Sequence, residues 1–133
     1  MDLDEPTDTI AGRFTIHVNG KTLSNDLEDN ETITPAKFGS DPAIFTLRDG
    51  ALECGDRFLG RHCAEDRSLL PKHVYWFKKS EVDRQSMRPT MAYPVEGTIE
   101  LRFDGLTASE LDGYIVVHLI QENEKSTIKM YNE

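Results

Sequence analysis

The chain has few cysteines, few aromatic residues and no long apolar run. Its 133 residues include two cysteines and one tryptophan, and aromatic residues make up 8% of the total. No apolar stretch approaches the roughly 18 residues that a membrane-spanning helix requires. Basic residues are also few: the chain has 15 Lys and Arg but 24 Asp and Glu, which gives a net charge of −9. This balance repels phosphate backbones and anionic lipid surfaces, so we expect neither nucleic acid nor a membrane as partner.

The first nine residues also lack the basic start and the apolar stretch of a secretion signal. The chain is then either cytoplasmic or a mature secreted form that carries an added Met1. Two features favour secretion: the even number of cysteines permits one disulfide, and Asn30 opens an Asn-Glu-Thr glycosylation pattern. We therefore expect a secreted protein with a glycan at Asn30, with a cytoplasmic location as the alternative.

The length fits one domain. Residues 1–9, which carry four acidic side chains, are predicted to form a flexible tail, and residues 10–133 a single β-rich domain. In residues 12–20, Phe14, Ile16 and Val18 alternate with polar residues, which predicts a half-buried strand that ends in an Asn19-Gly20 turn. The Asp49-Gly50 pair between two apolar runs predicts a hairpin. Further strands are predicted at 73–79, 97–103, 113–121 and 126–131.

Little helix is expected. Residues 64–70 allow one or two helical turns before Pro71, and Thr107 with Glu110 forms a capping-box pattern that predicts a short helix ending at Gly113. Segments 21–41 and 80–96 are predicted to be long loops.

About eight strand candidates predict an all-β fold, either an antiparallel β-sandwich or a barrel. Asn-Gly and Asp-Gly turns recur at Gly20, Gly50 and Gly105, which suggests a threefold, β-trefoil-like alternative, although the spacings of 30 and 55 residues do not repeat. No motif ties the chain to a family. The Gly-x-Trp opening of lipocalins, for example, is absent, because Arg13 and Phe14 follow Gly12.

The stretch from Cys54 to Ser68 concentrates reactive residue types. Cys54 and Cys63 have eight residues between them, and glycines near both ends of this segment let the chain fold back, so we predict a disulfide that closes a ten-residue ring. Such a ring stabilises a domain by just under about 3 kcal/mol. The alternative is two reduced thiols. The spacing with His62 does not suit zinc, so no metal site is expected. Asp66, Ser68 and His73 supply the residue types of a catalytic triad, but we expect a solvated turn in which Asp66 or Ser68 caps backbone amides.

Two predicted strands, 73–79 and 113–121, have apolar residues on both faces, which is more apolar surface than a two-layer sheet needs. In 73–79, Val74 and Trp76 point one way and Tyr75 and Phe77 the other, so something must cover the second face. The cover is a loop of the chain, a second subunit in a homodimer, or a ligand. For the ligand we predict a patch formed by Tyr75, Trp76, Phe77 and Tyr93. Aromatic rings beside carboxylates and amides suit a carbohydrate, and a protein surface or an apolar small molecule fits equally.

The leading hypothesis is therefore a small acidic binding protein, without a cofactor and without enzymatic activity. The alternative is a small β-barrel enzyme, an isomerase or cyclase, that uses His118 as acid or base. His118 lies among apolar residues, where an ionisable group needs a partner or undergoes a change in pKa. A closed cavity around His118 would favour the enzyme, and an open aromatic groove would favour binding.

Overall fold

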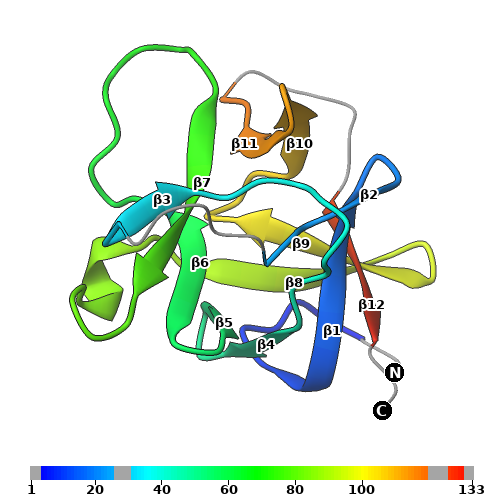
Figure 1. Cartoon of the computed structure of the whole chain (residues 1–133). Helices are drawn as coiled ribbons and strands as arrows, with labels where there is room; N and C mark the ends of the chain where they lie inside the picture. Colours follow the sequence, from blue (N-terminus) through cyan, green and yellow to red (C-terminus); the bar gives the residue numbers. More distant parts are fainter. Residues whose placement is uncertain (1–3, 26–30, 120–125, 131–133) are drawn as a thin grey trace.

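The computed structural model describes residues 4–25, 31–119 and 126–130, and it is built of antiparallel β-strands (Figure 1). The strands are β1 (Ile10–Val18), β2 (Lys21–Thr22), β3 (Ile33–Pro35), β4 (Phe45–Arg48), β5 (Ala51–Cys54), β6 (Arg57–Arg61), β7 (Lys72–Lys78), β8 (Thr90–Val95), β9 (Thr98–Phe103), β10 (Ala108–Leu111), β11 (Tyr114–Val117) and β12 (Ser126–Met130). One short 3₁₀ turn, η1 (Arg84–Ser86), lies between β7 and β8. The predicted all-β fold with little helix is confirmed.

Tight turns account for much of this architecture. In the described segments, five two-residue turns have positive φ at both positions, which is the backbone conformation of a type I′ hairpin turn. They are Asn19-Gly20, Asp49-Gly50, Glu96-Gly97, Asp104-Gly105 and Asp112-Gly113. Because glycine adopts positive φ without strain, each of these pairs fixes where one strand ends and the next begins.

The strand pairing repeats along the chain in three units of four strands each: β1 to β4, β5 to β8 and β9 to β12. Within a unit the first strand turns back into the second, as in β1 with β2 and β5 with β6. The fourth strand links neighbouring units, because β4 pairs with both β1 and β5, and β12 pairs with both β9 and β1.

The third strands of the units meet one another. β3 pairs with β7, β7 pairs with β11, and Lys37 just after β3 forms a bridge with Tyr114 of β11. β5 and β8 are not neighbours in the described sheet, although the Thr90 amide donates to the Gly50 carbonyl at 2.8 Å. The outcome is a curled sheet that forms a half-barrel, with a threefold strand arrangement that is β-trefoil-like.

The irregular spacing of the turns has a simple cause. Gly20 and Gly105 lie in equivalent turns, between the first and second strands of their units, and the counterpart in the middle unit is Gly55. Gly50 lies in another kind of turn, between β4 and β5, whose counterpart is Gly97 between β8 and β9. Gly20 and Gly105 therefore lie in one kind of turn and Gly50 in another, so the spacings between the three glycines need not be equal.

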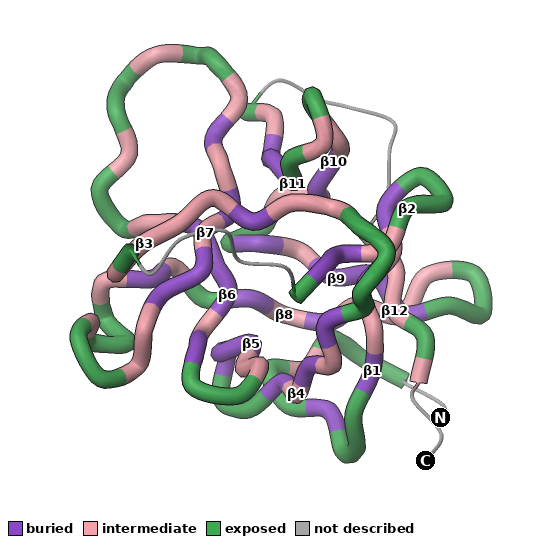
Figure 2. The backbone as a smooth tube through the Cα atoms, in the orientation of Figure 1, coloured by how far each residue is buried: buried purple, intermediate pink, exposed green. Residues whose placement is uncertain are grey.

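The core fills the inside of the curled sheet, where buried segments of most strands face one another (Figure 2). Phe45 lies at its centre, stacked on Trp76 at 5.6 Å and on Phe14 at 6.4 Å between ring centroids. All three rings are completely buried. The predicted alternation of Phe14, Ile16 and Val18 is confirmed, since all three side chains face this core.

Two predicted helices are wrong. Residues 108–111 form strand β10, because Asp112-Gly113 makes a tight turn that pairs β10 with β11, and the Glu110 carboxylate accepts the Gly113 amide instead of capping a helix. Residues 64–70 form an irregular loop between β6 and β7. The predicted loops 21–41 and 80–96 contain strands β2, β3 and β8, and the predicted strand at 113–121 ends at Val117.

The described part of the predicted tail contacts the body of the domain. Thr7 forms an antiparallel bridge with Ala92 of β8, through hydrogen bonds of 2.9 and 2.8 Å in the two directions. The Gly50 amide donates to the Asp8 carbonyl at 2.9 Å.

The predicted disulfide is wrong, because both cysteines are free thiols. Cys54 ends β5 and pairs with Arg57 across a tight turn, after which β6 runs away from that turn. Cys63 lies beyond the far end of β6, roughly 20 Å along the strand at about 3.3 Å per residue. A disulfide requires Cα atoms within about 7 Å. The expectation of secretion thereby loses one of its two supports, and the other, Asn30, lies outside the described residues.

Candidate functional site

The clearest candidate site is built on β7, whose two faces differ. Val74 and Trp76 point into the core and are completely buried. His73, Tyr75 and Phe77 alternate with them and face outward, as the two-residue period of a strand requires.

The outward residues form an aromatic row. Ring centroids lie 6.0 Å apart for His73 and Tyr75 and 6.3 Å apart for Tyr75 and Phe77. Tyr114 of β11 packs edge-on against His73 at 5.5 Å, and His62 lies 5.8 Å from Phe77. Strand pairing produces these contacts, because β11 and β6 flank β7 on its two sides. Rings at such distances stabilise one another.

Among the residues that the structure describes, only one end of this row is covered by other parts of the chain. Phe77 is completely buried in a second, smaller cluster. Its other members are Tyr75 of the same strand and, from other segments, Ala51, Met87, Ile33, Phe58 and Val82. Tyr75 and His73, nearer the start of β7, keep part of their surface exposed. The outer face of β7 is therefore covered by other segments of the chain at Phe77, as one of the predicted alternatives requires, and remains partly exposed at Tyr75 and His73.

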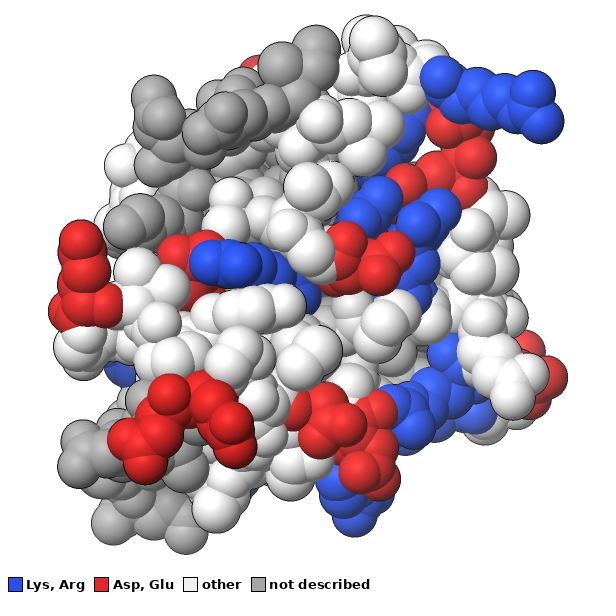
Figure 3. Space-filling model, turned by 180° about the vertical axis from the view of Figure 1, so that it is seen from behind, with Lys and Arg blue, Asp and Glu red and all other residues white. Residues whose placement is uncertain are grey.

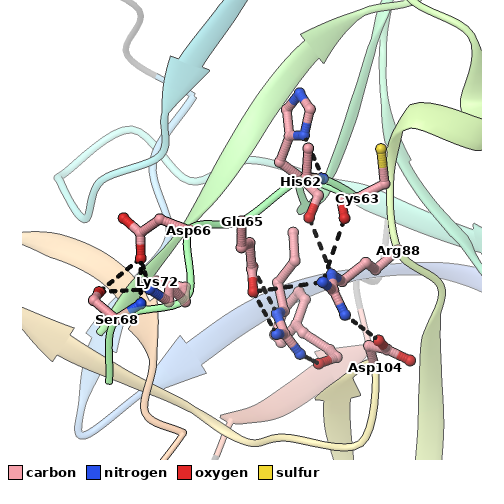
Figure 4. Close-up of polar contacts among 11 residues, drawn as sticks. His62, Cys63, Glu65, Asp66, Ser68, Lys72, Arg88 and Asp104 are labelled. Atoms are coloured by element: carbon pink, nitrogen blue, oxygen red, sulfur yellow. Dashed lines mark hydrogen bonds and ion pairs between the residues drawn. The ribbon is translucent and has the colours of Figure 1, made fainter. Parts of the chain in front are cut away.

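Beside the exposed end stands the loop of residues 62–71, which projects from the body at the upper left of Figure 1. Its base is held by charged groups (Figure 4). The buried Arg61 donates two hydrogen bonds to the Glu65 carboxylate, at 2.7 and 3.0 Å, and a third to the Phe103 carbonyl at 3.0 Å. Arg88 donates to the His62 carbonyl at 3.0 Å and pairs with Asp104 at 3.0 Å. The carboxylate of Glu65 therefore has a fixed position.

A second set of bonds shapes the rest of the loop. The Asp66 carboxylate accepts hydrogen bonds from the Ser68 amide at 3.0 Å and hydroxyl at 2.6 Å, and it pairs with the buried Lys72 ammonium. These bonds, with those from Lys72 foremost, lower the pKa of Asp66 to about 2. The Ser68 hydroxyl also accepts the Leu70 amide at 3.4 Å. The predicted capping turn is confirmed. Ser68 bonds directly to Asp66, which is not how a Ser-His-Asp triad is connected.

Between this loop and the aromatic row lies a groove of about 390 Å³, which we call the β7 groove. Its lining residues are Ile33, His62, Ala64, Glu65, Asp66, Pro71, Lys72, His73 and Tyr75. The volume lies within the range of small-molecule sites. One wall is aromatic and apolar, and the other presents two carboxylates that are held by cations.

His73 lines this groove and also carries a polar atom that is not exposed to it. Its Nδ1 atom is buried and has no hydrogen-bond partner among the described residues. Partial burial lowers the pKa of the imidazole, so the ring is neutral near pH 7. A neutral histidine offers one donor and one acceptor, and an unpaired buried polar atom is unfavourable until something bonds to it.

The four aromatic residues predicted as one patch do not lie together. Tyr75 lines the β7 groove and Phe77 continues its row beneath the cover, but Trp76 belongs to the core and offers a ligand no surface. Tyr93 lies on β8, where the Arg102 guanidinium stacks 4.0 Å from its ring centroid. Sequence reasoning missed Glu65 and Lys72 because their roles come from the path of the loop, for which no periodic pattern exists.

His118 lies just beyond β11, partly exposed, in a surface groove of about 380 Å³. The buried carboxylate of Glu100 lines the same groove and pairs with Arg102 at 3.0 Å. This groove is not the closed apolar cavity that would favour the enzymatic alternative.

Charged side chains elsewhere are intermixed. On the face shown in Figure 3, Lys and Arg lie next to Asp and Glu and do not gather into a continuous basic surface. Within the described residues, no three His, Cys, Asp or Glu side chains group as metal ligands would. Nor does the described part of the chain contain a helix that is long and apolar enough to cross a lipid bilayer.

Comparison with protein families, with curated proteins and with solved structures found no match to this chain. Any function must therefore be argued from the residues of the site.

Proposed function

We propose that this protein binds carbohydrate and that the β7 groove is its binding site. The observation that carries the proposal is an aromatic row left exposed at one end, in the same groove as two carboxylates that are held by cations. Both surfaces line a single groove.

The chemistry of a sugar matches these two walls. The C–H face of a pyranose ring stacks on an aromatic ring, which Tyr75 supplies. Its hydroxyl groups donate to carboxylates, and Glu65 and Asp66 have lone pairs to accept them. The other predicted ligand classes, a protein surface and an apolar small molecule, have less use for two carboxylates in so small a groove.

The wall is also pre-organised. Arg61 and Lys72, which orient Glu65 and Asp66, are both buried. Because these side chains are already ordered, binding a sugar loses little conformational entropy from the protein.

A glycan array tests the proposal with three forms of the protein. We expect the unmodified protein to bind at least one class of glycan and Tyr75→Ala to lose that binding. Tyr93→Ala is the matched control, because it removes the same ring from β8 outside the groove, and it should bind normally. Thermal unfolding of each variant shows that the fold is retained.

Two results would overturn the proposal. One is an array on which the folded, unmodified protein binds no glycan. The other is a glycan whose binding depends on Tyr93 and not on Tyr75, which would place the site on β8.

A further inference from the structure

A second groove lies on a different part of the molecule, where β1 is irregular. Ile10 pairs with Leu47 of β4 and Phe14 pairs with Phe45, so β1 advances four residues while β4 advances two. The extra residues 11–13 form a bulge and are exposed between two buried neighbours. Gly12 makes this path possible, because its φ of 95° is one that other residues rarely adopt. Bulges redirect side chains and recur beside functional sites.

The bulge borders a groove of about 490 Å³, which we call the bulge groove. Its lining residues are Thr9, Ile10, Gly12, Arg13, Ile44, Thr46, Leu47, Arg48, Glu53, Gly55 and Lys79. They come from β1, from the β4–β5 hairpin and from the segment after β7. Separate elements thus supply the cations: Arg13 from the bulge, Arg48 from β4 and Lys79 from beyond β7.

The charge of this lining is opposite to that of the chain. Three cations line the groove with one carboxylate, that of Glu53, whereas the whole chain carries −9. Glu53 is shared: one oxygen lies 2.6 Å from Lys79 Nζ and the other 3.5 Å from Arg48 Nη2. A single carboxylate between two cations leaves the lining with an excess of positive charge.

We propose that the bulge groove binds an oxyanion, a phosphate or carboxylate group of a small ligand. Arg48 and Lys79 contact the anion on the solvent side of Glu53. Guanidinium groups offer paired donors that match the oxygens of either anion. The Thr46 hydroxyl in the lining adds a neutral donor. This site is separate from the β7 groove and does not depend on the carbohydrate proposal.

The test is a titration of the full chain with inorganic phosphate and, separately, with acetate, followed through backbone amide signals in NMR spectra. We expect saturable shifts at Gly12 and Gly55 with at least one anion, and the stronger of the two identifies the preferred group. Arg48→Gln should weaken binding by about fivefold, the factor that corresponds to about 1 kcal/mol for an exposed charge. Lys21→Gln, which removes a charge outside the groove, is the matched control and should leave binding unchanged.

Glu53→Gln separates a binding site from a purely structural network of ion pairs. In a binding site this change frees two cations from their shared carboxylate, so affinity for the anion should rise by about fivefold. In a structural network the same change lowers stability and gives no gain in affinity. That second result would overturn the proposal, as would non-saturable shifts or equal losses in Arg48→Gln and Lys21→Gln.

Discussion

Within the described residues, the inner face of β7 is buried from Lys72 to Trp76, whereas its outer face is closed at Phe77 only. Val74 and Trp76 are sealed in the core, and Phe77 on the opposite face is sealed as well, under Met87. Tyr75 and His73 follow the same outward alternation but keep exposed surface above the β7 groove. The difference teaches that residues on the same face of one strand can differ in burial, with surplus apolar surface covered at one residue and exposed at the next.

Trp76→Ala should have the largest effect on stability. The ring is completely buried and stacks on Phe45, so its removal leaves a large cavity. Removal of such a ring lowers the free energy of unfolding by about 3–5 kcal/mol. Urea unfolding followed by circular dichroism measures the change. A variant as stable as the unmodified protein would show that the inner face is not the core.

Gly60→Ala tests the closed end of the outer face. A Cβ atom at this position in β6 would lie 2.6 Å from Met87 Sδ and even closer to Met87 Cγ. Overpacking of this kind lowers stability by about 1–3 kcal/mol. Because the clash is with one side chain, Gly60→Ala combined with Met87→Ala should lose less stability than the two single changes added together. Simple additivity in the urea titrations would mean that Met87 does not cover Gly60.

Tyr75→Ala should lower the free energy of unfolding by only about 1 kcal/mol, since part of the ring is already exposed. Its effect on sugar binding should be far larger than its effect on folding. The comparison with Trp76→Ala, measured in the same urea titration, sharpens the contrast between the two faces. If Tyr75→Ala unfolds as easily as Trp76→Ala, Tyr75 belongs to the core and the groove has no aromatic wall.

Asp66 provides a smaller, pH-dependent effect. Its pKa of about 2 lies below the ordinary value of 3.8, so its ionised form favours the ordered loop above that ordinary value. This contribution is lost as the pH falls through about 2. The Ser68 amide signal in NMR spectra should therefore titrate near pH 2 in the unmodified protein and not at all in Asp66→Asn. A midpoint near 4 would mean that Lys72 and Ser68 do not hold this carboxylate.

The cysteines should show the smallest effect. With two free thiols, a reducing agent should leave the melting temperature unchanged, and a thiol assay on the unfolded chain should count two. Cys63→Ser should be neutral because Cys63 is exposed. A reductant-dependent drop in melting temperature would show that the two sulfurs are joined.

The features of the fold that could be predicted from the sequence are those that depend on neighbouring residues, above all the tight turns. Asp49-Gly50 and Asn19-Gly20 predicted their hairpins because positive φ at two successive residues demands such pairs. Asp112-Gly113 follows the same rule, and the helix that the capping-box pattern of Thr107 and Glu110 predicts there is wrong. Local capping was outweighed there by pairing with β11.

The sequence could not predict which face of β7 is buried in the core, because apolar residues alternate onto both faces of this strand. Which face enters the core depends on the contact of Trp76 with Phe45, which in turn stacks on Phe14, and both phenylalanines lie far away in the sequence. The walls of the β7 groove depend likewise on how Arg61 and Lys72 fix an irregular loop.

The central claim is that the open end of the outer face of β7 binds a sugar. The most direct measurement is a set of amide NMR titrations of the unmodified protein with the methyl glycosides of glucose, galactose, mannose and N-acetylglucosamine. The account predicts that at least one of them shifts the signals of Glu65, Asp66, His73 and Tyr75 while those of Tyr93 and His118 stay in place. Absence of shifts in the groove with every glycoside, or shifts centred on Tyr93 or His118, would contradict it.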